Sequence, residues 1–352
     1  MNESGAEYNL KSHAKRVMQG LMKRSICTAA IFAGSLILAS TALAEDCRLE
    51  RAASLDMKLT HDGRILVPVS IEGTSELMML DTGSPISIVF QHVVDSLKLI
   101  TRNIYEGQVF TSAGSQFTAL ASIKNLQIDQ MTARDVRFLV EPTSFSDDKA
   151  LGGLLGSDIM HNYDVELDFE QRKVNLFLQT HCPGKVIYWP ATAVAAIPFR
   201  TSSDSHIIIP VQLEGKELDA LVDTGAGTSV LFLNAAQNQL GLHPGTPDLK
   251  QVGELHPGVP VYEHVFKSLG LDGIAISNIR FAVFENETAM AMRSTAETGT
   301  RIGSATEQNG VTDAILGIHE LSKLHIFISY KEKMLYLTPP TTSPIVTPSP
   351  VH

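Results

Sequence analysis

Basic residues are scarce in this sequence. Its 352 residues include 28 lysines and arginines against 38 aspartates and glutamates, a formal net charge of −10. Proteins that bind nucleic acid need a basic face to neutralise phosphates, and no basic stretch interleaved with aromatic residues is present. The charge therefore argues against nucleic acid as a partner.

Several catalytic motifs are also missing. The sequence has no G-x-S-x-G elbow and no G-x-x-x-x-G-K-[ST] loop, so nothing indicates a serine-hydrolase or nucleotide site. The stretch GIHELSK at 317–323 begins like the zinc-protease motif H-E-x-x-H, but Lys323 stands where the second histidine ligand belongs. The other histidines show no ligand spacing. We expect no metal site and no cofactor.

The first 44 residues have the pattern of a signal peptide. A basic stretch at 11–24 precedes an apolar stretch at 25–40, and Ala42-Leu43-Ala44 has the form of a cleavage site. The alternative is a membrane anchor, but Ser, Thr and Gly interrupt the apolar stretch, which is short for a span. Cleavage would remove five basic and two acidic residues and change the net charge from −10 to −13. We expect a secreted protein, most simply a bacterial periplasmic one, without stable membrane association. N-terminal sequencing, with Glu45 as the first residue, tests this.

The sequence has three cysteines, and cleavage would leave two, Cys47 and Cys182. An even pair in an oxidising compartment favours a disulfide. The alternative is two free thiols.

The sequence contains an internal duplication. A shift of 142 places the segment 64–90 on the segment 206–232, and a shift of 143 places 123–140 on 266–283. A third matched pair, 154–177 and 315–338, lies at a shift of 161. The 18 extra residues of the second half fall within 284–310, a polar stretch that indicates a surface loop.

Each half has the pattern of β structure. Short runs with β-branched or alternating residues, such as RILVPVSI and HIIIPVQL, are broken by turn signals such as EGTS and EGKE. Brief helices are expected at 91–99, at 233–242 and after each Leu-Gly. We predict an all-β protein with an N-terminal lobe at 45–182, a linker at 183–194, a C-terminal lobe at 195–338 and a disordered Pro/Thr-rich tail at 339–352.

An Asp-Thr-Gly sequence follows an apolar run in both halves. The two stretches are MMLDTGSPISIVF at 78–90 and ALVDTGAGTSVLF at 220–232. A lone buried carboxylate is costly, so two aspartates at matching places predict a pair that meets. The plainer alternative is that Asp81 and Asp223 only cap turns.

These motifs resemble those of the retropepsin-like aspartic proteases, with two such lobes fused in one chain. The apolar-Leu-Gly segments LLGSDIM and ILGIHEL resemble the second element of that family, which packs behind the catalytic loop. The resemblance covers nearly all of the chain after the leader. It implies a bilobal aspartic-protease architecture, two closed β lobes with the active site at their interface.

The resemblance implies that Asp81 and Asp223 form a catalytic dyad. Two adjacent carboxylates cannot both ionise cheaply, so they share one proton, a behaviour for which aspartic proteases are the standard example. The charged member acts as general base on a water, and the protonated member donates to the scissile carbonyl. We expect the glycines to permit tight turns, the threonine hydroxyls to bond the opposite loop, and Ser84, unlike its counterpart, to donate to the neighbouring carboxylate. The scaffold residues so assigned are Thr82, Gly83, Ser84, Thr224, Gly225 and Ala226.

Two further matched stretches, 108–117 and 251–260, occupy the places of the family's flaps, hairpins that close over an extended peptide. The alternative is that they are ordinary surface hairpins. The candidate flap residues are Thr111, Ser112, Ala113, Gly114, Gly253, His256 and Gly258.

The sequence thus predicts an aspartic endopeptidase that acts on a peptide or protein substrate. Because one chain carries both aspartates, we expect an active monomer. The alternative is a non-catalytic peptide-binding or regulatory protein that has kept the fold.

Overall fold

The computed structural model describes residues 48–104, 109–110, 116–117, 119–141, 151–202, 205–286 and 312–340. The chain divides into two compact units, Met1–Ala44 and Glu45–His352, and all that follows concerns the second unit. The predicted leader and most of the predicted tail lie outside the described residues, as does the polar stretch 287–311. In the described part of the chain, no helix is both long and apolar enough to cross a membrane.

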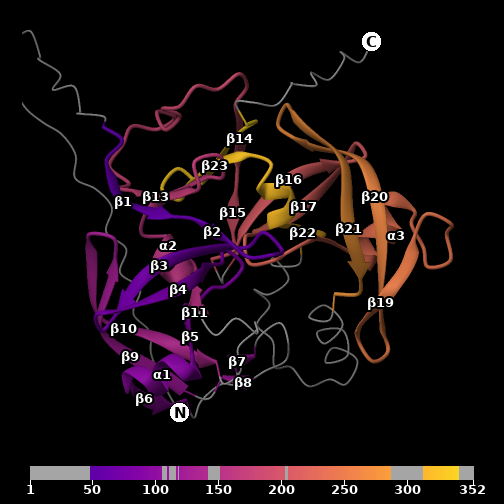
Figure 1. The fold of residues 1–352 in the computed structure, drawn as a ribbon. Helices are drawn as coiled ribbons and strands as arrows, with labels where there is room; N and C mark the ends of the chain where they lie inside the picture. Colours follow the sequence, from indigo (N-terminus) through magenta and orange to yellow (C-terminus); the bar gives the residue numbers. More distant parts are fainter. Residues whose placement is uncertain are drawn as a thin grey trace, which may run out of the picture. The chain divides into compact units, whose positions relative to one another are not determined.

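The first half forms a closed β barrel (Figure 1). Antiparallel pairing of Ser70 with Gln127 and of Ile71 with Leu126 joins β3 to β9 and closes a ring of six strands, with β2 and β6 at the edges. In spatial order the strands are β2 (Lys58–Leu59), β3 (Ile65–Ile71), β4 (Thr74–Leu80), β11 (Leu151–Leu155), β5 (Ile88–Phe90), β10 (Met131–Glu141), β9 (Ala119–Ile128) and β6 (Ile100–Asn103).

The second half repeats this topology. Its ring closes where Gln212 pairs with Gly270 and Leu213 with Leu269. In spatial order the strands are β15 (Arg200–Thr201), β16 (Ile207–Leu213), β17 (Lys216–Asp223), β22 (Ala314–Gly317), β18 (Ser229–Phe232), β21 (Ile274–Phe284), β20 (Val259–Leu271) and β19 (Lys250–His256). The repeat in the sequence is therefore a repeat of barrels.

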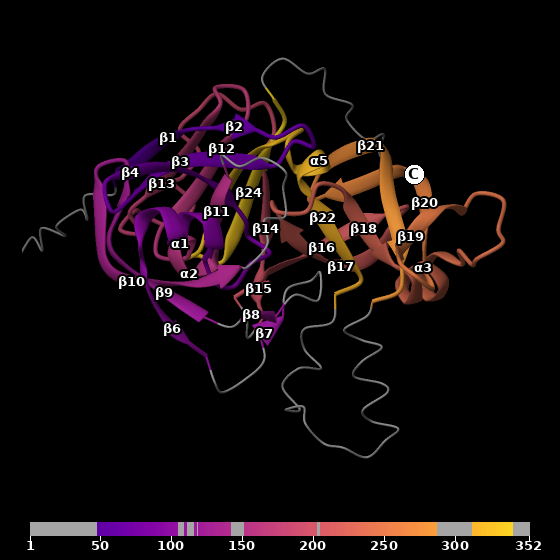
Figure 2. The ribbon, with the colours of Figure 1, turned by 60° about the horizontal axis from the view of Figure 1, so that its bottom comes forward.

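A third sheet takes three strands from each half. Its order is β1 (Arg51–Asp56), β13 (Lys173–Phe177), β12 (Asp164–Asp168), β23 (His325–Ser329), β24 (Met334–Thr338) and β14 (Ala195–Pro198). The halves meet where β12 pairs with β23, with Glu166 opposite Phe327. Figure 2 shows β14 beside the yellow strand β24. The sequence predicted a linker between two lobes but not this shared sheet.

The predicted hairpin turns and helices are present. Glu72-Gly73 and Glu214-Gly215 both have positive φ, at 49° and 84° and at 49° and 75°, the conformation that two-residue β-hairpins favour. The helices are α1 (Gln91–Leu97), α2 (Ser157–Met160), α3 (Leu233–Leu240) and α5 (Ile318–Leu321). The helices α2 and α5 directly follow the two Leu-Gly elements, as expected.

Alternation of side chains gives the barrels their cores. In β16 the residues Ile207, Ile209, Val211 and Leu213 are buried, whereas Pro210 and Gln212 are exposed. Strands of the shared sheet differ, because every residue of β12 and β23 is buried. Those strands contain charged residues, so their burial requires partners.

Candidate active site

Each motif aspartate lies at the end of a barrel strand. Asp81 follows β4, and Asp223 is the last residue of β17. Behind them run the Leu-Gly strands, parallel to the first: Leu80 pairs with Leu155, and Asp223 with Gly317. The Asp81 amide donates to the Leu155 carbonyl at 3.0 Å. The predicted packing of these elements behind the catalytic loops is confirmed.

The two threonines bind the opposite loops. The backbone amide of Thr82 donates to Thr224 Oγ1 at 3.0 Å, and that of Thr224 donates to Thr82 Oγ1 at 3.0 Å. Each hydroxyl in turn donates across to a carbonyl at 2.7 Å, Thr82 to Val222 and Thr224 to Leu80. Both threonines are completely buried. This reciprocal network joins the two Asp-Thr-Gly loops.

The glycines allow the carboxyl groups to approach the opposite loop. A Cβ added at Gly83 would lie 2.4 Å from Asp223 Cγ, and one at Gly225 would lie 2.4 Å from Asp81 Cγ. A tight turn does follow the first aspartate, where the Ser84 amide donates to the Asp81 carbonyl at 3.3 Å. Neither glycine has a positive φ, so the observed reason that excludes a side chain here is close packing between the loops.

Loop amides bind both aspartates. Asp223 Oδ1 accepts hydrogen bonds from the amides of Gly225 at 2.8 Å and Ala226 at 3.1 Å. Asp81 Oδ1 accepts one from Gly83 at 2.9 Å, and the Ser84 amide also binds Asp81 and lowers its pKa. The Ser84 hydroxyl instead donates to the Ile86 carbonyl at 2.8 Å. The expected bond from this hydroxyl to Asp81 was thus wrong.

The aspartates interact directly. Burial raises the pKa of Asp81 to about 8, and the charge of Asp223 and the hydrogen bond between their side chains act in the same direction. Burial also raises the pKa of Asp223, but the Gly225 and Ala226 amides, Asp81 and the charge of His206 oppose this. The two carboxyl groups therefore titrate as a pair that shares one proton and one negative charge.

A protein-family model described as Aspartyl protease matches residues 67–159 and 209–319, more than half of the chain. The chain belongs to the aspartyl protease family. The match also confirms the resemblance to retropepsin-like proteins and the bilobal architecture of two homologous barrels. No curated protein matches the chain.

Solved structures similar to this aspartyl protease family member include three with low identity. Basic 7S globulin from soybean has 8% identity and a TM-score of 0.46, over 85% of this chain and 98% of that one. An aspartic proteinase from Irpex lacteus has 12% identity and a TM-score of 0.49, over 82% and 97%. A retropepsin-like aspartic protease from Rickettsia conorii has 20% identity and a TM-score of 0.29, over 43% and 96%.

The candidate flap stretches of this aspartyl protease family member lie at hairpins. Thr111, Ser112, Ala113 and Gly114 are outside the described residues, but β7 (Val109–Phe110) and β8 (Gln116–Phe117), which flank them, pair with each other. Gly253 and His256 lie on β19, and Gly258, with φ of 91°, turns the chain into β20. Their role as flaps stays a prediction.

The predicted disulfide has one described partner. Cys182 is disulfide-bonded. Cys47 lies outside the described residues. The pairing of these two cysteines stays a prediction.

Metal-ligating residues do not cluster in the part of the chain that the structure describes, where no group of three or more His, Cys, Asp or Glu could hold an ion. His319 Nδ1 instead lies 2.8 Å from Glu320 Oε1, and Lys323 forms an ion pair with the same carboxylate.

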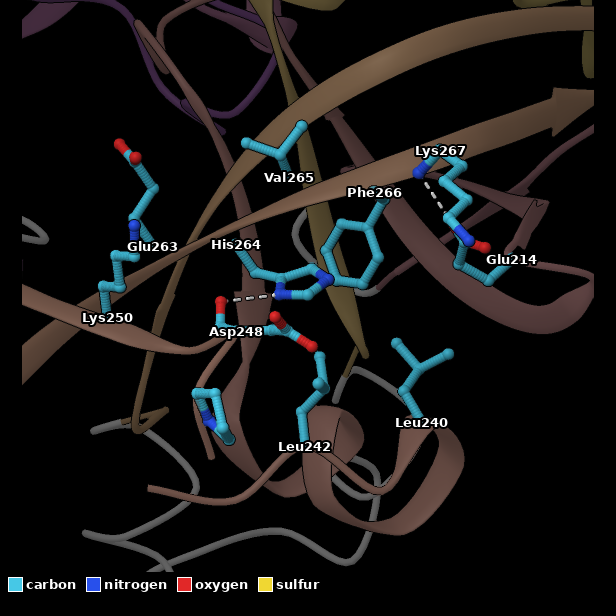
Figure 3. A pocket seen from close by; sticks show the side chains of 11 residues that line it. Glu214, Leu240, Leu242, Asp248, Lys250, Glu263, His264, Val265, Phe266 and Lys267 are labelled. Atoms are coloured by element: carbon cyan, nitrogen blue, oxygen red, sulfur yellow. Dashed lines mark hydrogen bonds between the residues drawn. The ribbon is translucent and has the colours of Figure 1, made fainter. Parts of the chain in front are cut away.

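A cavity of about 590 Å³ in the second barrel lies away from the motif loops (Figure 3). His264 points into it from β20, opposite Leu242 beyond the end of α3. In the first barrel, β6 pairs with the matching stretch of β9, for example Thr101 with Ala121. The described pairings of β20 with β19 run from Val259 to Glu263 and stop before His264. The cavity thus marks a place where the barrels differ, and neither Asp81 nor Asp223 lines it.

Sequence reasoning missed the residues that begin each repeat, Arg64 and His206. They match at a shift of 142, the same shift that aligns the two aspartates. It also missed the buried charges of the shared sheet, because the alternation of VELD does not reveal burial on both faces.

Proposed function

We propose that this protein is an aspartic endopeptidase whose dyad is Asp81 and Asp223. The observation that supports this most directly is the hydrogen bond between the two carboxyl groups, whose burial raises both pKa values. Such a pair holds one proton and one negative charge in the same site, as acid–base catalysis on an amide requires.

In this proposal the two aspartates have different roles in catalysis. Asp223 is the general base that takes a proton from water, and Asp81 donates its proton to the carbonyl oxygen of the scissile peptide bond. The resulting diol collapses when Asp223 returns its proton to the leaving nitrogen and Asp81 recovers one from a diol hydroxyl. The C–N bond breaks, one water is consumed, and the dyad returns to its starting state.

The substrate in this proposal is a peptide in extended conformation. The hairpin of β19 and β20 carries exposed Val252 and Leu255, at 59% and 49%, which offer apolar contact to a bound chain. Backbone groups of such hairpins can add a peptide as an extra strand. One chain supplies both aspartates, so the protein would act as a monomer.

The experiment compares wild type with Asp81→Asn, Asp223→Asn and the double variant on a diverse peptide library. Each single change should reduce cleavage by at least about 10³-fold, and the double change should add little, because the two groups act as a unit. Pepstatin should inhibit the wild type. Circular dichroism and thermal melts verify folding.

A folded single variant that keeps half of the wild-type rate would contradict the dyad. Wild-type protein that binds library peptides but cleaves none of them between pH 3 and 8 would instead identify a non-catalytic peptide-binding protein.

A further inference from the structure

Continued past the paired residues, the strand register takes one nitrogen-bearing side chain to the position across from each aspartate. In the ladder of β3 and β4, Leu66 pairs with Met79, and continuing by two residues takes Arg64 to the position across from Asp81. In the ladder of β16 and β17, Ile208 pairs with Leu221, and the same continuation takes His206 to the position across from Asp223. Such cross-strand neighbours share a face of the sheet.

Both side chains bring a buried nitrogen that lacks a hydrogen-bond partner. These atoms are Nε of Arg64 and Nε2 of His206. Buried polar atoms are usually paired. Two such atoms at matching positions beside the dyad therefore need an explanation that core packing does not provide.

The charge at the first position is already neutralised. Arg64 Nη2 lies 2.8 Å from Asp62 Oδ2, and the hydroxyl of Thr60 donates to the same carboxylate. Asp62 Oδ2 is 3.0 Å from where a Cβ at Gly227 would lie, so this ion pair packs against the loop that follows Asp223. Because this ion pair compensates its charge, Arg64 has little net effect on the pKa of Asp81.

The second position differs. Among the described residues, His206 forms hydrogen bonds through its backbone: its amide donates to Ser202 Oγ at 3.2 Å, and its carbonyl accepts from the Ser202 amide at 3.1 Å. Its positive charge lowers the pKa of Asp223. The repeat thus has a compensated cation beside Asp81 and an imidazole beside Asp223.

The charged groups on the elements around His206 are few in the described residues. Asp223 lies across the ladder, and Asp81 is hydrogen-bonded to it. On neighbouring strands Arg200 Nη2 and Asp219 Oδ2 form an ion pair at 2.8 Å, which compensates both charges. Asp204, two residues before His206, lies outside the described residues, and the test below includes it.

We propose that the imidazolium form of His206 holds the negative charge of the dyad on Asp223, which leaves the shared proton on Asp81. This inference rests on the proposed function and makes His206 a positioning residue of that reaction. Protonated, it favours the ionised carboxylate across the ladder; neutral, it withdraws that support. The general base is thereby selected by a positioning residue.

The first test is the pH dependence of kcat/KM for four variants. His206→Gln should move the acid limb, which reports ionisation of the dyad, to higher pH by about one unit, because a positive charge that favoured ionisation is lost. His206→Arg should restore the wild-type acid limb. Arg64→Gln, the matched change in the other half, and Asp204→Asn should leave that limb in place.

The second test does not depend on activity. The Asp223 carboxyl carbon, followed by NMR, should titrate at higher pH in His206→Gln than in wild type, because a positive charge that lowers the pKa of Asp223 is lost. Arg64→Gln should not shift it, because Asp62 compensates the charge of Arg64.

An acid limb in His206→Gln that coincides with that of the wild type, together with an unshifted Asp223 carboxyl titration in the same variant, overturns the inference. A shift of the limb in Asp204→Asn as large as in His206→Gln also overturns it, since Asp204 would then control the charge. A shifted Asp223 titration in a protein that cleaves no peptide keeps the coupling and rejects the endopeptidase.

Discussion

Thr82 and Thr224 each accept the other's backbone amide at 3.0 Å, across the boundary between the two barrels. Because each hydroxyl also donates to a carbonyl of the opposite loop, four hydrogen bonds join the motif loops with no exposed atom of either threonine. The position of one aspartate relative to the other depends on this network.

Thr82→Val should weaken the network from both sides. It leaves the Thr224 amide and the Val222 carbonyl buried and unpaired, at about 1–3 kcal/mol for each group. The free energy of unfolding from urea titrations should fall accordingly, and peptide cleavage should fall with it. Thr82→Ser keeps the hydroxyl and should stay near wild type. A loss in Thr82→Ser with none in Thr82→Val would mean that the methyl group, not the hydroxyl, matters.

Gly83→Ala and Gly225→Ala should each separate the aspartates. The new methyl group would meet the opposite carboxyl carbon at 2.4 Å, so a loop must shift. A displacement of about 1 Å can cost about 10²-fold in rate. Gly253→Ala, where nothing lies within 4 Å, serves as the control for stability. Unchanged kcat/KM in both loop variants would show that the dyad does not need this approach.

Stability should fall as pH rises through the range in which Asp81 keeps its proton. The pKa of Asp81 is raised from about 3.8 to about 8, so between these values the folded state holds a proton that the unfolded state has released. The free energy of unfolding then decreases with pH, by at most about 1.4 kcal/mol per unit. Asp81→Asn should remove this slope. Urea titrations from pH 4 to 8 measure it, and parallel curves for the two proteins would refute it.

Glu166 should stabilise the shared sheet at neutral pH. Burial raises its pKa, but hydrogen bonds from His325, Tyr188 and Asn175 more than reverse this, so the pKa lies below its usual 4.5. That stability is present above pH 4.5 and lost as pH falls through the folded-state value.

Glu166→Gln should therefore cost about 3–5 kcal/mol at pH 7, the usual loss when one partner of a buried charged pair is removed. The cost should shrink in acid. Glu50→Gln, at an exposed position, is the control. Equal effects of the two changes at pH 7 would exclude a stabilising role for the buried carboxylate.

Reduction of the disulfide at Cys182 should lower the free energy of unfolding by roughly 2–5 kcal/mol. Cys47→Ser should mimic reduction if Cys47 is the partner, whereas Cys27→Ser should not. Peptide mapping under non-reducing conditions identifies the pair. A fragment that links Cys182 to Cys27 would reject the predicted pairing.

The sequence by itself was sufficient to predict the duplication, the β class, the brief helices and the two aspartates. These follow from local patterns, since alternation, turn residues and apolar runs act over a few neighbouring positions. Because the two halves repeat, a feature predicted in one half is also predicted at the matching position of the other, and the same alignment matches Arg64 with His206.

Only the tertiary structure decided what surrounds those patterns. The sheet shared by β12 and β23 joins residues about 160 positions apart, such as Glu166 and Phe327, and no local signal marks such a pairing. The reason for Gly83 is likewise a contact with Asp223, on the other half of the chain, and not its own backbone angle. Local conformation depends on neighbouring residues in the sequence. Close packing around a residue and the pKa of a buried carboxyl group depend on the groups that the tertiary fold places beside them.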